Sequence, residues 1–261
     1  MSAEPLPSHD DDQQRRFVGV ARVYGEQALG RLSTSHAVVV GLGGVGSWAA
    51  EALARQGLGR ITLIDLDVIV PSNVNRQLHA LTEHFGRGKA EAMAERLRGI
   101  NPRAEIRVID DFLTRDNAAD CLSPQPDIIL DCCDDAKAKL TLVLHARRHR
   151  NVLVVCGAAG GKIDPTRLAV EDLARTEQDP LLARLRKRLR KHHGYPEEPG
   201  KSFGITCIYS DEPIHAPDGV CDTGAALSCA GYGSVVTVTA SMGLLAVSTA
   251  IAQLLRRSRR T

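Results

Sequence analysis

Three glycines near residue 40 have the spacing of a phosphate-binding turn. Gly41, Gly43 and Gly46 form the pattern G-x-G-x-x-G, with Gly44 inside it. Glycine lets the backbone turn sharply and come close to a phosphate group. A helix that starts after the turn offers free N–H groups and the positive end of its dipole to that phosphate. The glycines therefore predict a nucleotide site.

An acidic residue completes the nucleotide pattern. Asp65 lies 19 residues beyond Gly46, at the end of the apolar run 61–64, and Asp67 follows it closely. A carboxylate at this spacing can accept a hydrogen bond from a ribose hydroxyl. The pattern fits both ATP and NAD, so the identity of the nucleotide stays open at this point.

Further polar and charged residues lie at the ends of predicted strands. Asn73 and Arg76 follow the second strand, Asp134 follows the fourth, and Lys89 starts a helix. In an open parallel sheet these ends line one crevice. There Arg and Lys can clamp a triphosphate, and Asp134 can hold Mg²⁺ through oxygen. Each residue alone could be a surface residue or a helix cap, but together they favour ATP over an NAD-dependent dehydrogenase.

The elements that must position these residues alternate between strand and helix. Helices are expected at 47–54, 90–99 and 136–150. They separate strands that apolar runs predict at 37–40, 61–64, 106–109, 127–130 and 152–156. Such alternation is typical of an α/β fold. We therefore predict a Rossmann-like, doubly wound, mostly parallel sheet with a C-terminal extension of helix, strands and loops.

The composition indicates one large domain. The chain has 261 residues, of which 43% are hydrophobic, and a net charge of only +2. We expect a disordered tail at 1–14, a nucleotide-binding part at 15–157 that starts with one or two short helices, and a substrate-binding part of the same domain at 158–261. None of the seven cysteines has C-x-x-C spacing, which argues against a zinc site of paired knuckles. The absence of a signal peptide pattern favours the cytoplasm.

The C-terminal part contains two segments of special composition. Residues 223–255 carry no charge and are long enough for a membrane helix. Because Gly, Ser and Thr are frequent there, we favour a buried strand or turn followed by a core helix from about Ser241. Before it, Asp179 is a good helix cap, and the helix that follows has leucines on one side and basic residues on the other. A strand is expected at 203–209.

The motifs of the chain resemble those of the ubiquitin-activating-enzyme-like superfamily. The likeness covers about residues 16–255. It is carried by GLGGVGSWAAEALARQGLGRITLIDLD, SNVNRQ, GKAEAMAERLRGINP and DCCDD. Within that superfamily the chain resembles the family of tRNA threonylcarbamoyladenosine dehydratases through GSWAAEALAR, NRQLHAL, INPRAEIRVIDDFLT and GGKIDPTRLAVEDLARTEQDPL.

This resemblance implies a reaction and a set of site residues. Members of the superfamily adenylate a carboxylate with MgATP. The dehydratases use ATP to cyclise N6-threonylcarbamoyladenosine next to the tRNA anticodon, through adenylation of its threonyl carboxylate. By the same resemblance Asp65 holds the ribose, Asn73 and Arg76 form the N-x-x-R motif, and the catalytic residues are Arg76, Lys89 and Asp134. Arg22 is the candidate for an arginine that a partner subunit supplies in a homodimer.

Several alternatives and partners stay open. A sulfur-carrier protein adenylyltransferase is the nearest rival, although the four zinc cysteines usual in that group are missing. A non-catalytic adaptor or membrane scaffold would use residues 223–255. Cys229 could form a thioester as in relatives, but a small buried core residue is the favoured interpretation. The resemblance also implies a possible monovalent cation (Na⁺ or K⁺) and a possible cysteine desulfurase or sulfur-acceptor partner.

An implied tRNA substrate gives the basic helix after Asp179 a candidate role. Its leucines at 181, 182, 185 and 189 can pack on the domain, so its basic residues would face outward, away from the nucleotide crevice. Phosphate contacts are largely independent of sequence. The candidate nucleic-acid contacts are Arg184, Arg186, Lys187, Arg190 and Lys191.

Overall fold

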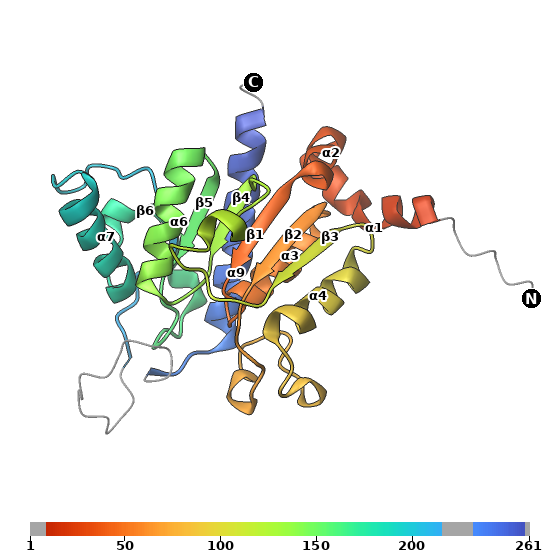
Figure 1. Cartoon of the computed structure of the whole chain (residues 1–261), viewed down its shortest axis with the longest axis horizontal. Helices are drawn as coiled ribbons and strands as arrows, with labels where there is room; N and C mark the ends of the chain where they lie inside the picture. The colour runs from red at the N-terminus through yellow and green to blue at the C-terminus, as the bar shows by residue number, and fades with distance from the viewer. Residues whose placement is uncertain (1–8, 216–231, 259–261) are drawn as a thin grey trace, which may run out of the picture.

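A mixed seven-stranded sheet forms the centre of the protein (Figure 1). The computed structural model describes residues 9–215 and 232–258. The strand order is β3-β2-β1-β4-β5-β7-β6, and only the edge pair β6–β7 is antiparallel. This confirms the predicted doubly wound α/β fold. The strands are β1 His36–Val40, β2 Arg60–Ile64, β3 Glu105–Ile109, β4 Ile128–Asp131, β5 Val152–Cys156, β6 Leu168–Asp172 and β7 Thr206–Ser210.

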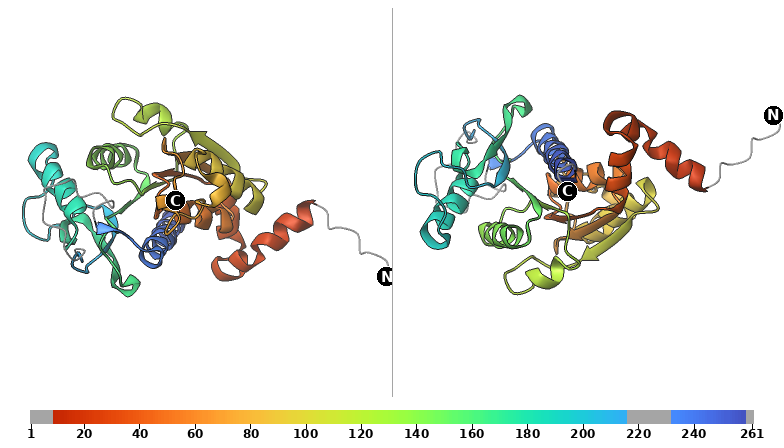
Figure 2. Two further views of the ribbon diagram at one scale, coloured as in Figure 1. Left: turned by 90° about the horizontal axis from the view of Figure 1, so that it is seen from below. Right: turned by 90° about the horizontal axis from the view of Figure 1, so that it is seen from above.

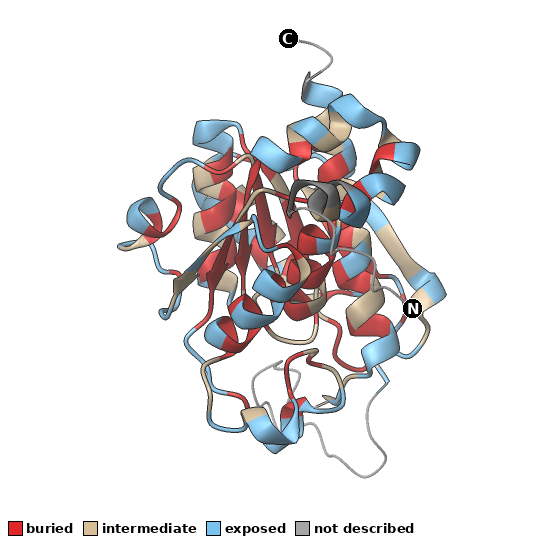
Figure 3. Ribbon diagram, turned by 90° about the vertical axis from the view of Figure 1, so that its right-hand side faces the viewer, coloured by how far each residue is buried: buried red, intermediate tan, exposed pale blue. Residues whose placement is uncertain are grey.

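Helices cover both faces of the sheet, as the two end views in Figure 2 show. In β1, Ala37 and Val39 belong to one buried cluster together with residues of α3, α4 and α9, whereas Val38 and Val40 belong to another together with residues of α5 and α6. Successive side chains of a strand point to opposite faces, so a strand covered on both faces is apolar throughout. The resulting buried core is visible in Figure 3. The helices are α1 His9–Tyr24, α2 Glu26–Thr34, α3 Gly46–Arg55, α4 Lys89–Ile100, α5 Ala118–Cys121, α6 Ala136–His149, α7 Pro180–His193 and α9 Val236–Ser258.

The N-terminal segment contains two helices, α1 and α2. Helix α1 begins at His9, so residues 9–14 of the predicted disordered tail 1–14 are helical, and residues 1–8 lie outside the described residues. A side chain added at Gly57 would meet Leu29 of α2 and Phe17 of α1, and Phe17 is buried. The two helices therefore belong to the folded body, beside the turn between α3 and β2.

The long C-terminal helix α9 is a core helix. By length and composition it could cross a membrane, but half of its most apolar window is buried inside the protein. It packs against α3, where a Cβ added at Gly243 would lie 2.4 Å from the Val45 carbonyl oxygen. The core helix expected from about Ser241 begins at Val236 instead.

The edge of the sheet was only partly predicted. The strand expected at 203–209 is β7, which begins at Thr206 because residues 202–205 form a loop held by the carboxylate of Asp172. Its antiparallel neighbour β6 was not predicted. Four of its five residues are only partly buried and Val170 is exposed, and the strand ends in Glu171 and Asp172, so no continuous apolar run marks it.

Candidate active site

A cavity of about 610 Å³ opens at the carboxyl ends of the central strands. This volume is typical of sites for small organic ligands. Its walls are the glycine turn after β1 and the loops after β2, β3, β4 and β5. It brings together most of the residues singled out from the sequence: Gly41, Gly43, Gly44, Asp65, Asp67, Asn73, Arg76, Lys89 and Asp134.

The three glycines of the G-x-G-x-x-G pattern have different structural roles. Gly41 has a φ of 85°, a left-handed conformation that glycine adopts without strain. A Cβ at Gly46 would lie 1.7 Å from the Gly41 carbonyl oxygen, so the start of α3 can approach β1 only with glycine there. A Cβ at Gly43 would meet no protein atom within 4 Å. Gly43 lines the cavity, and the space beside it is therefore available to a ligand.

Asp65 is a buried carboxylate held at the end of β2. Its Oδ2 accepts a hydrogen bond from the Leu42 N–H at 2.6 Å, and its Oδ1 accepts one from the Asp67 N–H at 2.9 Å. Burial raises the pKa of Asp65, and these donors together with the charge of Lys89 oppose the rise. A carboxylate has about four acceptor positions. Asp65 can therefore still accept hydrogen bonds from a ligand in the cavity.

Lys89 places an ammonium group in the cavity from the first residue of α4. The side chain is buried, and its Nζ lies 2.7 Å from Asp67 Oδ2. The carboxylate of Asp67 is half exposed. Lys89 is thus a buried cation with a partner at the cavity wall, which suits contact with an anionic ligand.

The loop after β2 carries the N-x-x-R pair on a rigid support. Asn73 is buried, and its Oδ1 accepts a hydrogen bond from the Val70 N–H at 3.2 Å. The Arg76 carbonyl accepts a hydrogen bond from Trp48 Nε1 at 3.0 Å, which ties the loop to α3. Arg76 Nη1 donates to the Ser72 carbonyl at 2.8 Å. A guanidinium has five donors in all, so Arg76 can still contact phosphate oxygens.

Two adjacent carboxylates after β4 have separate tasks. Asp135 caps α6, because its side chain accepts hydrogen bonds from the N–H groups of Lys137 and Ala138 at 3.1 and 3.0 Å. Asp134 is exposed and lines the cavity. The alternative that Asp134 is itself the helix cap is therefore wrong.

A buried ion pair supports this loop and was not predicted. Lys139 Nζ of α6 lies 3.0 Å from Asp131 Oδ1 at the end of β4 and donates to the Cys156 carbonyl at 2.7 Å. Burial, the largest single influence, would lower the pKa of Lys139, but the charge of Asp131, the hydrogen bond to it and the neighbouring thiols together raise this pKa. The pair connects β4, α6 and β5 at the floor of the site.

Two thiols also line the cavity. The pKa of Cys132 lies well above its usual range because of its contact with Cys156 and its burial. Burial and the charge of Asp131 do the same to the pKa of Cys133. Both side chains are therefore neutral thiols and poor nucleophiles. Cys229 lies outside the described residues.

The sequence analysis did not identify some of the residues that line the cavity. Residues 111–114 follow β3, and the rule that strand ends line the crevice could have identified them. Leu181 of α7 also reaches the cavity, so the expectation that this helix lies outside the nucleotide crevice is wrong at its first turn. Ser234 and Thr239 come from the C-terminal part, and no local pattern marks them.

Among the nucleotide-site candidates, Gly46 is buried at the start of α3 and does not line the cavity. Arg22 is the second such candidate in the described chain. It lies exposed near the end of α1, a helix that packs beside the turn after α3, and it does not line the cavity. Any contact of Arg22 with the site therefore requires a second copy of the chain.

The basic helix α7 differs in part from the prediction. Leu182, Leu185 and Leu189 are buried, as predicted. Arg186 Nη1 donates to the carbonyl oxygens of Leu173 and Thr176 at 3.0 and 2.8 Å. Arg190 Nε donates to the Pro196 carbonyl at 3.0 Å. The prediction of outward-facing side chains is thus wrong for Arg186 and Arg190, and holds for Arg184, Lys187 and Lys191.

Comparison with known sequences identifies the family of the chain. The sequence pattern of the ThiF family matches residues 15–261, nearly the whole chain. The chain belongs to the ThiF family. This ThiF-family membership confirms the resemblance found in the motifs around the glycine turn and the N-x-x-R loop.

Individual ThiF-family relatives are similar over their full length. The chain is 45% identical over 260 residues to tRNA threonylcarbamoyladenosine dehydratase of Escherichia coli, which covers 96% of this chain and 97% of that protein. It is 41% identical over 250 residues to the Haemophilus influenzae protein of the same name, with 95% and 96% covered. The crystal structure of the Escherichia coli enzyme in complex with ATP is similar, with a TM-score of 0.88, 44% identity and coverage of 96% and 98%.

Proposed function

We propose that this protein uses ATP to dehydrate N6-threonylcarbamoyladenosine in tRNA, next to the anticodon, by adenylating its threonyl carboxylate. The observation that carries the proposal is the convergence of Asp65, Arg76, Lys89 and Asp134 on one cavity of suitable size. The names of the two full-length relatives support the substrate, and the relative solved with ATP supports the nucleotide.

The reaction has two steps that balance without an oxidant or reductant. First, an oxygen of the threonyl carboxylate attacks the α-phosphorus of ATP, an O–P bond forms, and pyrophosphate leaves. Second, the carbamoyl group attacks the activated acyl carbon, a ring closes, the carbamoyl group releases an N–H proton, and AMP leaves with the carboxylate oxygen. The net change is the loss of one water from the nucleoside at the expense of ATP. Ring closure is intramolecular, so it needs positioning and no nucleophile from the protein.

The binding residues act on different parts of ATP. Asp65 accepts hydrogen bonds from the ribose hydroxyls, and the open space at Gly43 lets the backbone approach the phosphates. Arg76 and Lys89 neutralise the phosphate charge that builds up as pyrophosphate leaves. Lys89 exchanges its contact with Asp67 for a phosphate oxygen when ATP enters.

Asp134 fits the role of a magnesium ligand. Its carboxylate is exposed at the cavity because Asp135 takes the capping role. Mg²⁺ is usually bound through one or two carboxylates together with substrate phosphates, so a single aspartate is sufficient. When bound, Mg²⁺ would neutralise charge on the phosphates. A monovalent cation (Na⁺ or K⁺) remains an implication of the family resemblance.

Two rival activities make different demands on the site. An NAD-dependent dehydrogenase would not need cationic groups such as Arg76 and Lys89 at the cavity. A sulfur-carrier protein adenylyltransferase would use the same ATP site with a protein carboxyl terminus as substrate. Among the residues the structure describes, no cluster of three or more His, Cys, Asp or Glu side chains could hold a metal ion.

The assembly and location of the protein follow the family resemblance. We propose a homodimer, because Arg22 can reach an active site only from a second copy. Among the described helices, α9 is apolar enough for a membrane, but it is a core helix. This is consistent with a cytoplasmic location. A cysteine desulfurase or sulfur-acceptor protein remains a proposed partner.

Release of AMP and pyrophosphate tests the proposal. The protein would be incubated with ATP and either tRNA that carries N6-threonylcarbamoyladenosine or the same tRNA lacking the threonylcarbamoyl group. We expect equal amounts of AMP and pyrophosphate only with the modified tRNA. Release with a sulfur-carrier protein and not with the tRNA would favour the rival adenylyltransferase.

A further inference from the structure

A second cavity, of about 720 Å³, lies at the opposite end of the sheet from the ATP site. It opens at the amino-terminal ends of β5 and β7. Its walls are the C-terminal half of α6, residues 194–196 after α7, residues 203–205 with Thr206 at the start of β7, and two residues of α9. None of these residues lines the first cavity. The proposed reaction therefore does not use the second cavity.

The charge of the second cavity is positive. Arg147 and Arg150 from the end of α6 and Arg257 from the end of α9 line it, and none of its described lining residues is Asp or Glu. The carboxylate of Glu198, which lies close in sequence, is paired with Lys201 at 2.7 Å. Three guanidinium groups without a carboxylate in the wall favour an anion, and arginine binds phosphate oxygens well.

Aromatic rings line the same cavity. The Arg147 guanidinium carbon lies 5.0 Å from the centroid of the Tyr195 ring, a cation–π contact that orients this side chain. The Tyr195 and Phe203 rings lie 5.0 Å apart with planes inclined by 43°. Arginines beside aromatic rings are the combination that binds nucleotides of single-stranded nucleic acid, through the phosphate and the base.

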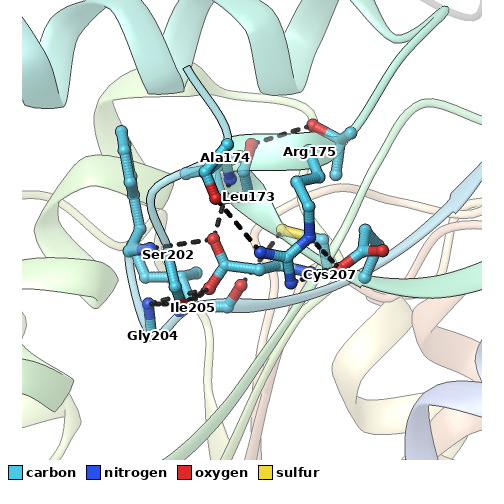
Figure 4. Close-up of polar contacts among 12 residues, drawn as sticks. Leu173, Ala174, Arg175, Ser202, Gly204, Ile205 and Cys207 are labelled. Atoms are coloured by element: carbon cyan, nitrogen blue, oxygen red, sulfur yellow. Dashed lines mark hydrogen bonds and ion pairs between the residues drawn. The ribbon is translucent and has the colours of Figure 1, made fainter. Parts of the chain in front are cut away.

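The wall that carries Phe203 is held in place by hydrogen bonds within the chain. Asp172 accepts hydrogen bonds from the Ser202 hydroxyl at 2.7 Å and from the N–H groups of Phe203 and Gly204 at 2.8 Å each. Figure 4 shows Ser202, Gly204 and Ile205 gathered at these contacts beside Ala174. The opposite wall is fixed where Arg257 Nη1 donates to the Arg150 carbonyl at 2.6 Å. A ligand would therefore enter a preformed site at low entropic cost.

Helix α7 connects the two cavities. Leu181 in its first turn lines the ATP cavity, and Gly194, its C-cap, lines the second. The helix has 14 residues, which corresponds to a length of about 21 Å. Its exposed side carries Arg184, Lys187 and Lys191. At ~3.4 Å per nucleotide, roughly six stacked nucleotides span this distance along a cationic surface.

We propose that the second cavity binds a nucleotide of the tRNA substrate, several nucleotides away from the one that reacts. The proposal rests on the proposed function, because a tRNA with its modified nucleoside in the ATP cavity would extend along α7. Arg147, Arg150 and Arg257 contact phosphate oxygens, and Tyr195 and Phe203 contact a base. The site adds affinity and register for tRNA and takes no part in the chemistry.

A triple variant tests the proposal: Arg147→Gln, Arg150→Asn and Arg257→Gln. Asparagine is chosen at 150 because this residue has a φ of 58°, a conformation that asparagine adopts more readily than most residues. We expect tRNA affinity to fall about tenfold or more, since charge-assisted contacts to phosphate are lost. The slope of log affinity against log salt should flatten by about 0.7 to 0.9 for each lost contact. ATP affinity should be unchanged.

The control has the same loss of charge outside the cavity. Arg98→Gln, Arg148→Gln and Arg256→Gln remove three exposed arginines that line neither cavity. We expect this variant to bind tRNA within about twofold of the parent chain. If the two triple variants bind tRNA equally well, the proposal is wrong. If the first triple variant unfolds, the single variant Arg150→Asn tests the proposal instead. It should weaken tRNA binding severalfold and leave thermal stability unchanged. Unchanged tRNA binding by this single variant would overturn the proposal.

Two further measurements separate the possible ligands and failures. Titration with AMP measures the number of nucleotides bound per chain. A second AMP that is lost in the triple variant would show that the cavity binds free nucleotide and would contradict a tRNA site. Binding of tRNA is measured without turnover. A chain that binds tRNA through these arginines but leaves N6-threonylcarbamoyladenosine unchanged would refute the proposed function and keep this inference.

Discussion

Lys139 Nζ lies 3.0 Å from Asp131 Oδ1, and both side chains are completely buried beside the loop that carries Asp134. Breaking a buried ion pair by removing one partner leaves an uncompensated charge and typically costs about 3–5 kcal/mol. We therefore expect Lys139→Met to lower the free energy of unfolding by about that amount. Urea unfolding measures it.

The double variant Lys139→Met, Asp131→Asn provides the control for this pair. It removes both charges, so it should be more stable than Lys139→Met alone. A double variant that is less stable than the single one would show that Asp131 does not depend on Lys139.

The two aspartates after β4 should separate catalysis from stability. Asp134→Asn removes the proposed magnesium ligand, so we expect AMP formation to be lost while the melting temperature stays unchanged. Asp135→Ala removes the helix cap and should cost about 1 kcal/mol of stability with most activity kept. Steady-state kinetics and thermal unfolding of both variants check this. Full activity of Asp134→Asn would remove Asp134 from the mechanism.

Substitutions at Gly46 and Gly43 should separate fold stability from ATP binding. A Cβ at Gly46 would collide with the Gly41 carbonyl, so Gly46→Ala should destabilise the fold strongly. A Cβ at Gly43 meets no protein atom, so Gly43→Ala should fold normally and bind ATP at least tenfold more weakly because the added methyl group takes ligand space. Calorimetric titration with ATP measures this loss. Normal ATP binding by Gly43→Ala would place the phosphates elsewhere.

Asp172 should make stability depend on acid pH. Burial, the largest single influence, raises the pKa of this carboxyl, but the hydrogen bonds from Phe203, Ala174, Ser202 and Gly204 together lower the pKa below its usual value. Its contribution is complete above the unfolded-state pKa of about 4 and is lost as the pH falls through the lower folded-state pKa. Asp172→Asn should cost about 2 kcal/mol at pH 7.

Unfolding at several pH values tests this account of Asp172. The difference in stability between the parent chain and Asp172→Asn should shrink as the pH falls below about 4. A difference that stays constant from pH 7 to pH 3 would mean that the charge of Asp172 does not hold the 202–205 loop.

Helix α7 should separate tRNA binding from folding. Arg184→Gln, Lys187→Gln and Lys191→Gln together remove exposed charges, so the Michaelis constant for tRNA should rise and the melting temperature should stay within a few degrees. Arg186→Gln breaks contacts with the Leu173 and Thr176 carbonyls and should instead lower stability by about 1–3 kcal/mol. An unchanged Michaelis constant in the exposed triple variant would exclude this face as a tRNA contact.

Local sequence patterns were sufficient to predict the parallel strands of the sheet and a group of residues that the cavity at their carboxyl ends brings together. The run 37–40 is apolar because β1 is covered on both faces, and such runs identify parallel strands directly. The glycine turn and Asp65 have a fixed spacing because one strand–turn–helix–strand unit sets their geometry. These features depend on neighbours close in the sequence, so a single sequence records them.

The features that were missed depend on long-range packing. Arg186 and Arg190 look like outward-facing residues on a helical wheel, yet their long side chains reach back to loop carbonyls. The contribution of Thr239 to the cavity exists only once α9 meets the turn after β1. The Asp131–Lys139 pair joins two consecutive elements, but it forms only when α6 packs on the sheet. The start of α1 at His9 was also missed, but a local pattern was present there. Acidic residues at 10–12 suit the first turn of a helix and could have predicted this start.

Mass spectrometry of tRNA nucleosides tests the central claim most directly. Modified tRNA would be incubated with the parent chain or with Asp134→Asn, with ATP or with NAD, digested to nucleosides, and analysed. We predict that N6-threonylcarbamoyladenosine loses one water only with the parent chain and ATP, in proportion to the AMP released. If the nucleoside mass stays unchanged while ATP is bound and the fold is intact, this protein is not a tRNA threonylcarbamoyladenosine dehydratase.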